Sequence, residues 1–591
     1  MEERRFPVVP LIVAAQAVWL GIVMGRGWYS GPDLANLSFA RGRSLSTGYL
    51  TESLGGHFGA PTRVLYWLLA RTDPLGWELT VGLRLVLQAL ATYLLWKLLR
   101  ELVGERPWLP VVLALYAFSA LLVPGIAVLS SGLGLSIAQA AVLGSFLLHV
   151  RYTRTGRLRL AVGTALLALL ALSFSDQSAQ CFLLLPVLSI GFLRTGPRER
   201  WQGWLLLVGA AAVFAGLYLS GDYTAGATAE GMGVDGALRL VSRTWFDVLG
   251  PALVGGPWNW RTTPGNYSAD AGPQVAVEVI GQAVLIALVV WSVRRTGARA
   301  LLAWAMPLVV GMVSILLVGL GRYDSLGGDI PYIGRYSHLT ALALALGVTL
   351  AFARTPEEGE RTVPEDPPWV PQLVPVALAA VLVASIVSGG GFAQTFWKVP
   401  GKAYVAALVK TAAADHRSTQ VFDSPVPVGV IPPIEPNHFV SDVLKLTDQR
   451  LRYDGLEPLP KMVDAAGNLV PATFVAATDL RDAVNTTCGI AVTGAGDHVV
   501  QLKPLDQDNA WFLQLQMLQS HANDLKVTVR NAAGKVIPFR TGAARVQPTG
   551  KVVALNWALE RGRPASVTLT TEDPDTSLCL LHALVGAPYA R

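Results

Sequence analysis

Long apolar runs recur along the first two thirds of the chain. About 20 residues of helix cross a hydrocarbon core of roughly 30 Å, so each run of this length predicts a membrane span. The pattern therefore predicts a polytopic α-helical membrane protein of about eleven spans. They lie near 7–25, 79–99, 107–124, 131–150, 160–174, 178–193, 202–219, 276–293, 300–320, 336–353 and 371–388.

Basic residues collect in alternate connections between these runs. They stand at the N-terminus and within 97–106, 151–159, 194–200 and 294–299, and the polar linker 353–368 falls on the same side. The positive-inside rule assigns that side to the cytoplasm. The remaining segments then lie outside: 26–78, 125–130, 175–177, 220–275, 321–335 and the whole tail from 389.

The tail changes from apolar runs to short β-favouring stretches separated by Gly, Asn and Asp. This pattern predicts an extracytoplasmic β-sandwich, jelly-roll-like, over 466–591. The expected domains are a transmembrane domain at 1–388, a connecting segment at 389–465 and the sandwich. Cys488 and Cys579 could form a disulfide there or remain two free thiols, and an oxidising compartment favours the disulfide. Trp511 and Trp557 could stack on sugar rings or fill the sandwich core.

Composition narrows the classes of function. Of 591 residues, 52% are hydrophobic, and the formal net charge is only +6. The mean hydropathy is +0.44. The basic residues fit membrane orientation better than nucleic-acid binding. Three cysteines are too few for a zinc cluster or a disulfide scaffold. The first apolar run is long enough to span, and we interpret it as an uncleaved first helix.

Several candidate chemical groups fall in the predicted outer segments. Asp33 follows the first run directly, and His57 and Arg63 stand before an apolar stretch, 64–69, that is typical of an interfacial helix. Arg84 lies inside the second run, where an ionisable group is costly and by default suggests a functional interior. Further polar candidates on the outer side are Asp176, Arg322, Asp324, Asp329 and Arg335.

Together these groups suggest transfer from a lipid phosphate. A carboxylate can take the proton of an acceptor hydroxyl, and arginines can hold a phosphate in bidentate geometry. Each residue also has a simpler alternative. Asp33 and Asp176 could be helix caps, Arg63 and Arg335 could be lipid anchors, and Arg84 could pair with a carboxylate for packing.

Three stretches carry a resemblance to a known group: 31–71, 82–102 and 334–353, the last followed by 396–408 and 423–433. They resemble the GT-C glycosyltransferases, which use polyprenyl-phosphate sugars. The likeness is to bacterial, especially actinobacterial, relatives of protein O-mannosyltransferases and to cell-wall arabinosyl- and mannosyltransferases. The resemblance implies that Asp33 is the catalytic base. From the chemistry of the outer groups themselves, we expect Arg63, Arg335 and His57 to bind the donor phosphate, with Asp176, Arg322, Asp324 and Arg84 in support.

The chain departs from that group's pattern in three places. Pro32 stands where relatives commonly have a second acid, and Asp176–Gln177 replaces a Glu-Lys or similar pair. The stretch 127–136 also lacks the bulky aromatic and polar residues expected there. Two hypotheses follow. The chain is a transferase that moves a sugar from a polyprenyl-phosphate donor to an extracytoplasmic envelope glycan or protein. Alternatively, it is a catalytically silent GT-C-like scaffold or glycan-binding subunit.

The expected location is the cell membrane, and no nucleic acid is an expected partner. No cofactor is firmly predicted, although Asp33 with Asp324 or Asp329 could bind a divalent cation.

Overall fold

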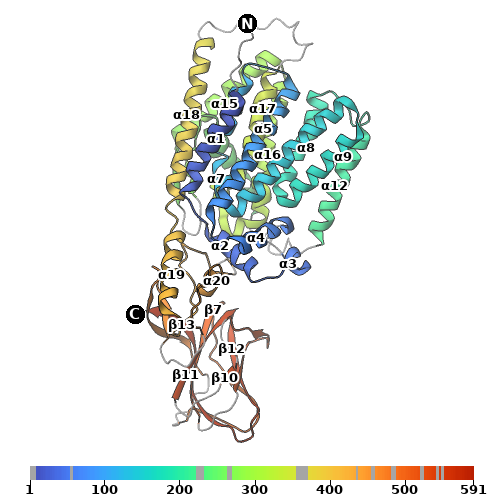
Figure 1. Cartoon of the computed structure of the whole chain (residues 1–591). Helices are drawn as coiled ribbons and strands as arrows, with labels where there is room; N and C mark the ends of the chain where they lie inside the picture. The colour runs from blue at the N-terminus through green and yellow to red at the C-terminus, as the bar shows by residue number, and fades with distance from the viewer. Residues whose placement is uncertain are drawn as a thin grey trace. The chain divides into compact units, whose positions relative to one another are not determined.

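The computed structural model describes residues 8–52, 58–220, 232–262, 269–353, 370–433, 435, 437–453, 460–480, 488–519, 525–540, 545–546 and 552–591. The chain forms two compact units, Met1–Val399 and Pro400–Arg591. The first unit is a helical bundle, and the second unit is mainly β-sheet (Figure 1). We refer to them as the bundle and the β unit.

Within the described residues, eight helical segments are long and apolar enough to cross a membrane. The prediction of a multi-pass helical membrane protein is confirmed. These segments are α1 (Val8–Gly25), α5 (Trp77–Val103), α8 (Leu129–Thr155), α12 (Trp201–Leu219), α15 (Val275–Thr296), α16 (Arg299–Leu326), α17 (His338–Phe352) with the turn before it, and α18 (Val370–Phe396).

Helix α8 is the central helix of the bundle. In its apolar window 89% of the residues are buried, against 6% in α12. Small residues let neighbouring helices approach α8 closely, as in other membrane bundles. A Cβ added at Gly144 would stand 2.9 Å from the Leu167 side chain of α9 (Leu158–Phe174). Helix α12 instead leaves its apolar side chains exposed, as expected of a lipid-facing helix.

The three other expected spans form shorter elements. The run near 107–124 divides into α6 (Leu109–Ala117) and α7 (Val123–Ala127). The run near 160–174 is α9, which has 17 residues. The run near 178–193 consists of α10 (Ala179–Phe182), α11 (Leu184–Pro186) and the π-helical η2 (Val187–Phe192). Pro124 and Pro186 lack a backbone N–H, so a regular helix cannot continue through them unchanged.

Three short helices follow α1 and form a layer at one end of the bundle: α2 (Gly31–Arg41), α3 (Thr47–Thr51) and α4 (Ala60–Thr72). Two arginines join α2 to α4 reciprocally. Arg41 Nη1 donates to the Ala70 carbonyl at 2.8 Å, and Arg71 Nη1 donates to the Ala40 carbonyl at 3.1 Å. Each guanidinium therefore satisfies a carbonyl at the C-terminal end of the other helix, where intrahelical partners are missing.

The segment between α12 and α15 is more structured than the loop that the sequence predicted. It contains α13 (Gly233–Arg243), the π-helical η4 (Thr244–Leu249) and α14 (Gly250–Leu253). Strands β1 (Trp260–Thr262) and β2 (Ala269–Ala271) pair antiparallel after them. After α16, the chain makes two 3₁₀ turns, η5 (Gly327–Tyr332) and η6 (Gly334–Ser337), before α17 begins.

The β unit begins with helices α19 (Gly401–Asp415) and α20 (Val440–Leu444) and continues as two antiparallel sheets. The smaller sheet has the order β10-β8-β12-β6, and the larger has the order β11-β7-β13-β4-β3. Strands β9 and β5 pair with β8 and β13. The strands are β3 (Lys461–Val463), β4 (Leu469–Thr478), β5 (Ile490–Thr493), β6 (Gly496–Gln501), β7 (Asn509–Gln519), β8 (Leu525–Asn531), β9 (Val536–Ile537), β10 (Arg545–Val546), β11 (Val552–Gly562), β12 (Pro564–Thr571) and β13 (Ser577–Ala590).

Alternate residues of both sheets form one buried core. Leu513 and Leu515 of β7 meet Val527 of β8 and Val567 of β12 in this core. The predicted sandwich architecture is therefore present. A disulfide joins Cys488 to Cys579, across 91 residues of sequence.

Trp511 and Trp557 belong to the same core, with 9% and 5% of their surface exposed. They fill the sandwich, which was the alternative to sugar stacking. Their burial favours core packing over sugar stacking for both rings.

Candidate functional site

Asp33 is the third residue of α2, where its carboxylate closes the start of the helix. Its Oδ2 accepts the N–H of Ser30 at 2.8 Å, as the reciprocal half of a capping box does. Its Oδ1 accepts the N–H of Ser130, in the first turn of α8, at 2.5 Å. Asp33 is 0% exposed. The expectation that it faces the outer aqueous surface is therefore wrong, because donors from α2 and α8 enclose it.

This enclosure changes the acid–base properties of Asp33. Burial raises the pKa of its carboxyl above the usual value, while the Ser30 and Ser130 hydrogen bonds and the charge of Arg84 act in the opposite direction. A general base must lie within hydrogen-bond reach of the proton that it abstracts. In this conformation backbone N–H groups occupy both carboxylate oxygens, so Asp33 does not face a substrate.

The positive charge of Arg84, in α5, acts on the Asp33 carboxylate, and Arg84 is also 0% exposed. Its Nη1 donates to the carbonyls of Ile126 at 2.9 Å and Ala127 at 2.6 Å. Its guanidinium lies 4.5 Å from the centroid of the Trp77 ring. No hydrogen bond joins Arg84 to Asp33 in the described part of the chain. The two charges attract each other across the α7–α8 turn, which both side chains hold in place.

Arg63 lies inside the layer of short helices, with 4% of its surface exposed. Its guanidinium stands 5.0 Å from the Phe39 ring and 5.2 Å from the Tyr49 ring, and its Nε donates to the Glu52 carbonyl at 2.8 Å. These contacts bind α3 to α4. They do not leave Arg63 open to a donor phosphate, contrary to the expectation. His57, the other candidate in this segment, lies outside the described residues.

An open polar pocket of about 450 Å³ lies at α3 and the residues that lead into it. Arg43, Ser46 and Glu52 line it, and Tyr49 contributes an aromatic surface. Arg43 stacks 5.0 Å from the Phe39 ring, so the floor of the pocket is held by packed rings and guanidinium groups. The sequence analysis did not identify this pocket.

Helix α7 connects the Asp33–Arg84 pair to a second group of polar residues. On one side its carbonyls receive the Arg84 guanidinium. On the other side it packs against η6 and the start of α17. A Cβ added at Gly334 would meet Pro124 at 2.7 Å, and one added at Gly125 would meet His338 at 2.8 Å. Helix α7 and the start of α8 therefore lie between these two groups in the network of contacts: Arg84 and Asp33 bind them, and the turn that carries Arg335 packs on α7.

The second group is an arginine–tyrosine cluster at η5 and η6. Arg322 Nη1 donates to the Tyr336 hydroxyl at 3.3 Å, and the Arg335 guanidinium lies 5.4 Å from the centroid of the Tyr336 ring. The Tyr332 ring, four residues earlier, has Arg243 at 5.3 Å and Arg261 at 5.6 Å. Each of these two tyrosines, which are four residues apart, therefore has two guanidinium groups beside it, and the four arginines come from four separate segments.

Two carboxylates contact this cluster. Tyr332 donates its hydroxyl hydrogen to Asp247 Oδ2 at 2.6 Å, and Arg243 Nη1 stands 2.7 Å from Asp329 Oδ1. Burial raises the pKa of Tyr332, and the hydrogen bond and charge of Asp247 raise it further. Tyr332 therefore stays a neutral donor. Guanidinium groups are the side chains best suited to binding a phosphate, which is why these arginines are candidates for an anion site.

Arg322 and Arg335 were found from the sequence, whereas Arg243, Arg261 and Tyr332 were missed. A local signal was present, since Gly-Arg-Tyr occurs twice within residues 321–336. No sequence signal indicated that Arg243 and Arg261 join the same cluster, because they belong to a segment predicted only as a loop.

The remaining acids are separate local features. Asp176 begins η1 (Asp176–Ser178), and its Oδ1 accepts the N–H of Gln177 at 2.8 Å. Asp324 lies in the last turn of α16 and is exposed. Across the described ranges, no group of three or more His, Cys, Asp or Glu side chains could hold a metal ion.

Comparison with known proteins gives three similar solved structures. Arabinosyltransferase EmbB from Mycobacterium smegmatis has 13% identity and a TM-score of 0.33, covering 100% of this chain and 66% of its own. Arabinofuranosyltransferase AftD from Mycobacteria has 11% identity and a TM-score of 0.35, covering 99% of this chain and 61% of its own. ArnT from Cupriavidus metallidurans, bound to undecaprenyl phosphate, has 14% identity and a TM-score of 0.38. The match covers 75% of this chain and 89% of the ArnT chain.

All three are proteins that this chain is similar to at low sequence identity. The chain spans slightly less than two thirds of the lengths of EmbB and AftD. No family model matches the chain, and no curated protein sequence does. At these identities and TM-scores, the likeness assigns no role to any individual residue.

Proposed function

We propose that the chain is a membrane glycosyltransferase that takes a sugar from a polyprenyl-phosphate donor. The acceptor would be an extracytoplasmic glycan or protein of the cell envelope. The observation that carries this proposal is the arginine–tyrosine cluster. Arg243, Arg261, Arg322 and Arg335 gather at one end of an apolar bundle, where a lipid phosphate would arrive from the membrane. Guanidinium groups bind phosphate in bidentate geometry and can stabilise the charge that develops as the sugar leaves.

The basic connections place this end of the bundle outside the cytoplasm under the positive-inside rule. We extend the proposal to the whole chain on that basis. Residues 1–388 would form the transferase domain, 389–465 a connecting segment and 466–591 an extracytoplasmic sandwich. The polar pocket beside Arg43 and Glu52 lies on the layer that follows α1, at the same end, and would accept hydrophilic groups of the substrates.

Asp33 has a conditional role in this proposal. It could take a proton from an acceptor hydroxyl only after the Ser130 N–H releases its Oδ1 and the α7–α8 turn moves. In the enclosed state it is a positioning residue. With Arg84 it would hold α7, and through α7 the turn that carries Arg335.

A second candidate function is a catalytically silent GT-C-like subunit that binds an envelope glycan or lipid. The specific observation in its favour is the complete burial of Asp33, whose oxygens are both hydrogen-bonded to backbone. A silent subunit would keep the anion-binding cluster and the sandwich and would lack a reachable base.

Complementation of a gene deletion tests both candidates. The variants are Asp33→Asn and the double variant Arg322→Gln, Arg335→Gln, with Arg157→Gln as the matched control. Arg157 is exposed and precedes α9, at the opposite end of the bundle. Membrane levels are matched, and the glycan linkages of the envelope are analysed.

We expect wild type and Arg157→Gln to restore a linkage lost on deletion, and the double arginine variant to fail. Purified protein with a polyprenyl-phosphate sugar then separates the candidates. Turnover supports the transferase, and no turnover despite a restored linkage supports the silent subunit. If the double arginine variant restores the linkage fully, the phosphate-binding role of the cluster is wrong.

A further inference from the structure

Helix α13 is amphipathic. At about 100° per residue, Val234, Ala237, Leu238, Leu240 and Val241 occupy one continuous arc of the helix. The opposite arc carries the polar side chains Asp235, Arg239, Ser242 and Arg243. A helix with this division requires an apolar partner for the whole of its apolar arc.

The protein itself covers only part of that arc. Leu240 is 0% exposed and packs against α16, where a Cβ added at Gly319 would stand 2.6 Å from Leu240 Cδ1. By contrast, Val234 is 76% exposed and Leu238 is 63% exposed. The half of the apolar arc that carries Val234 and Leu238 is therefore largely uncovered by the protein, at positions where exposure to water would be unfavourable.

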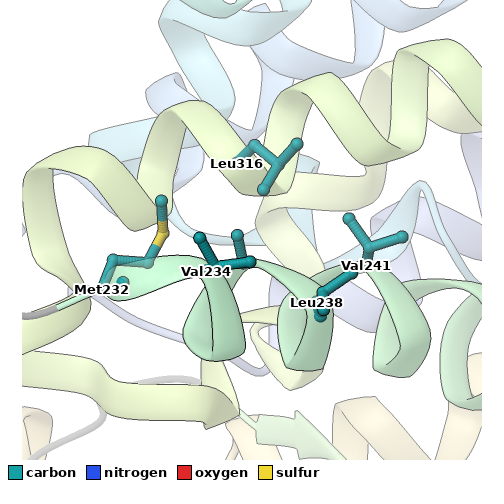
Figure 2. Close-up of a pocket in the computed structure, with 7 residues that line it drawn as sticks. Met232, Val234, Leu238, Val241 and Leu316 are labelled. Atoms are coloured by element: carbon teal, nitrogen blue, oxygen red, sulfur yellow. The ribbon is translucent and has the colours of Figure 1, made fainter.

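The uncovered half forms one wall of a groove. Figure 2 shows Val234, Leu238 and Val241 of α13 lying along one side and Leu316 of α16 along the other. The groove has a volume of about 430 Å³. All seven of its lining residues are apolar, from Met232 through Val241 and Leu316.

The position of Leu316 indicates what covers this groove. It lies eight residues before Asp324, the end of a 26-residue apolar segment. At about 1.5 Å per residue, it falls roughly 8 Å inside the edge of a 30 Å hydrocarbon core centred on that segment. Its neighbours Leu317 and Leu320 are 47% and 42% exposed, so the groove continues directly into the lipid-facing flank of α16.

The polar arc of α13 faces a different environment. Arg243 donates to the Gly328 carbonyl at 2.5 Å and contacts Asp329, both in η5. A Cβ added at Gly328 would lie 3.0 Å from Arg239 Cδ, so Arg239 extends past the same turn. Two arginines at the polar edge of a helix whose other face is apolar match the phosphate level of a lipid leaflet.

We propose that α13 lies in the plane of the membrane, and that acyl chains of leaflet phospholipids fill the groove between α13 and α16. Residues 232–243 are then an interfacial membrane element and not part of an aqueous loop. The inference is independent of the proposed enzymatic function, because it depends only on the exposure of α13 and the depth of α16.

Site-directed spin labelling of the full chain in phospholipid nanodiscs tests this proposal. Labels are placed at Val234→Cys and Leu238→Cys, with Asp235→Cys and Ser242→Cys as matched controls on the polar arc. All four positions are exposed, so the labels do not disturb the core. The remaining free cysteine, Cys181, is buried and 0% exposed. The readout is collision with oxygen, which concentrates in hydrocarbon, relative to collision with a water-soluble nickel chelate.

We expect the oxygen-to-nickel ratio at positions 234 and 238 to be several-fold higher than at 235 and 242. Equal ratios on the two arcs would overturn the proposal, because α13 would then lie in water. Dipolar broadening at 238 that disappears on dilution with unlabelled protein would also overturn it, since a second copy of the chain would cover the groove.

Discussion

Two buried aspartates occupy the same local position in the two units. Asp33 in the bundle and Asp442 in the β unit are each the third residue of a helix, and each is 0% exposed. Asp33 accepts the N–H of Ser30, and Asp442 accepts the N–H of Phe439 at 3.2 Å. The acid that the sequence singled out as catalytic thus shares its helix-capping geometry with an acid that no functional argument had selected.

The two sites differ in how the remaining charge is balanced. Asp442 has direct partners, with Arg540 Nη2 at 2.5 Å and Lys445 Nζ at 2.8 Å. Asp33 has the Ser130 N–H and the charge of Arg84, without a hydrogen bond to that arginine. An acid just after a membrane span can therefore be needed to accept a backbone N–H at the start of the next helix. Its catalytic assignment needs access to substrate, which the enclosed state of Asp33 does not provide.

The largest expected effect follows from removing Arg84. Arg84→Met leaves the Ile126 and Ala127 carbonyls without their donor and Asp33 without its counter-charge. We expect a loss of about 3–5 kcal/mol in the free energy of unfolding. Unfolding in mixed micelles measures it, with Arg157→Met as control. Adding Asp33→Asn should recover part of the loss, and strictly additive losses would show that the two charges are not coupled.

A smaller effect is expected at the corresponding site of the β unit. Arg540→Met removes one partner of Asp442 and a guanidinium 3.7 Å from the centroid of the Phe439 ring, but Lys445 remains. We expect a loss of about 1–3 kcal/mol. Hydrogen exchange in residues 439–445 of the full chain measures it, with the exposed Arg563→Met as control. A loss equal to that of Arg84→Met would contradict the role given to Lys445.

The pH dependence of the β unit offers a third test. Burial raises the pKa of Asp423 to about 6, the charge of Asp442 adds to this, and Ser441 and Arg540 oppose it. Between about pH 4 and 6, the folded state holds a proton that the unfolded state has released. The free energy of unfolding should therefore fall as pH rises through this window, by up to about 3 kcal/mol.

Asp423→Asn should remove that slope, because the amide does not titrate. Hydrogen exchange near residues 420–445, corrected for the intrinsic effect of pH, compares the variant with wild type at pH 4.5 and 6.5. An identical slope in both proteins would assign the pH dependence to other groups.

The smallest expected effect concerns the exposed ion pair of the arginine–tyrosine cluster. Asp329→Asn should change stability by less than about 1 kcal/mol, since the Asp329 side chain is 66% exposed. It frees Arg243 and removes one negative charge, so binding of undecaprenyl phosphate, measured by native mass spectrometry, should become tighter. Asp235→Asn, an exposed acid on α13, is the control. Weaker binding in Asp329→Asn would count against an anion site.

Much of the bundle could be predicted because long apolar runs are a direct physical signal. The eight long helices found among the described residues all coincide with predicted spans, and the predicted interfacial stretch lies in α4. The run near 107–124 was predicted less well, because hydropathy does not register the break around Pro124. The candidate site was predicted only in fragments. Arg322 and Arg335 were found, but nothing in the sequence relates them to Arg243 and Arg261, which are about 60 to 90 residues earlier.

The sequence by itself determined that the chain is a multi-pass membrane protein followed by a β-sandwich. The reason is that hydrophobic periodicity acts locally and needs no knowledge of contacts. The tertiary structure alone decided that Asp33 and Arg63 are enclosed, that Trp511 and Trp557 face a core, and that four arginines share one cluster. Each of these outcomes depends on which distant segments supply the neighbouring hydrogen-bond donors, rings and charges, and that information appears only when the helices and sheets pack.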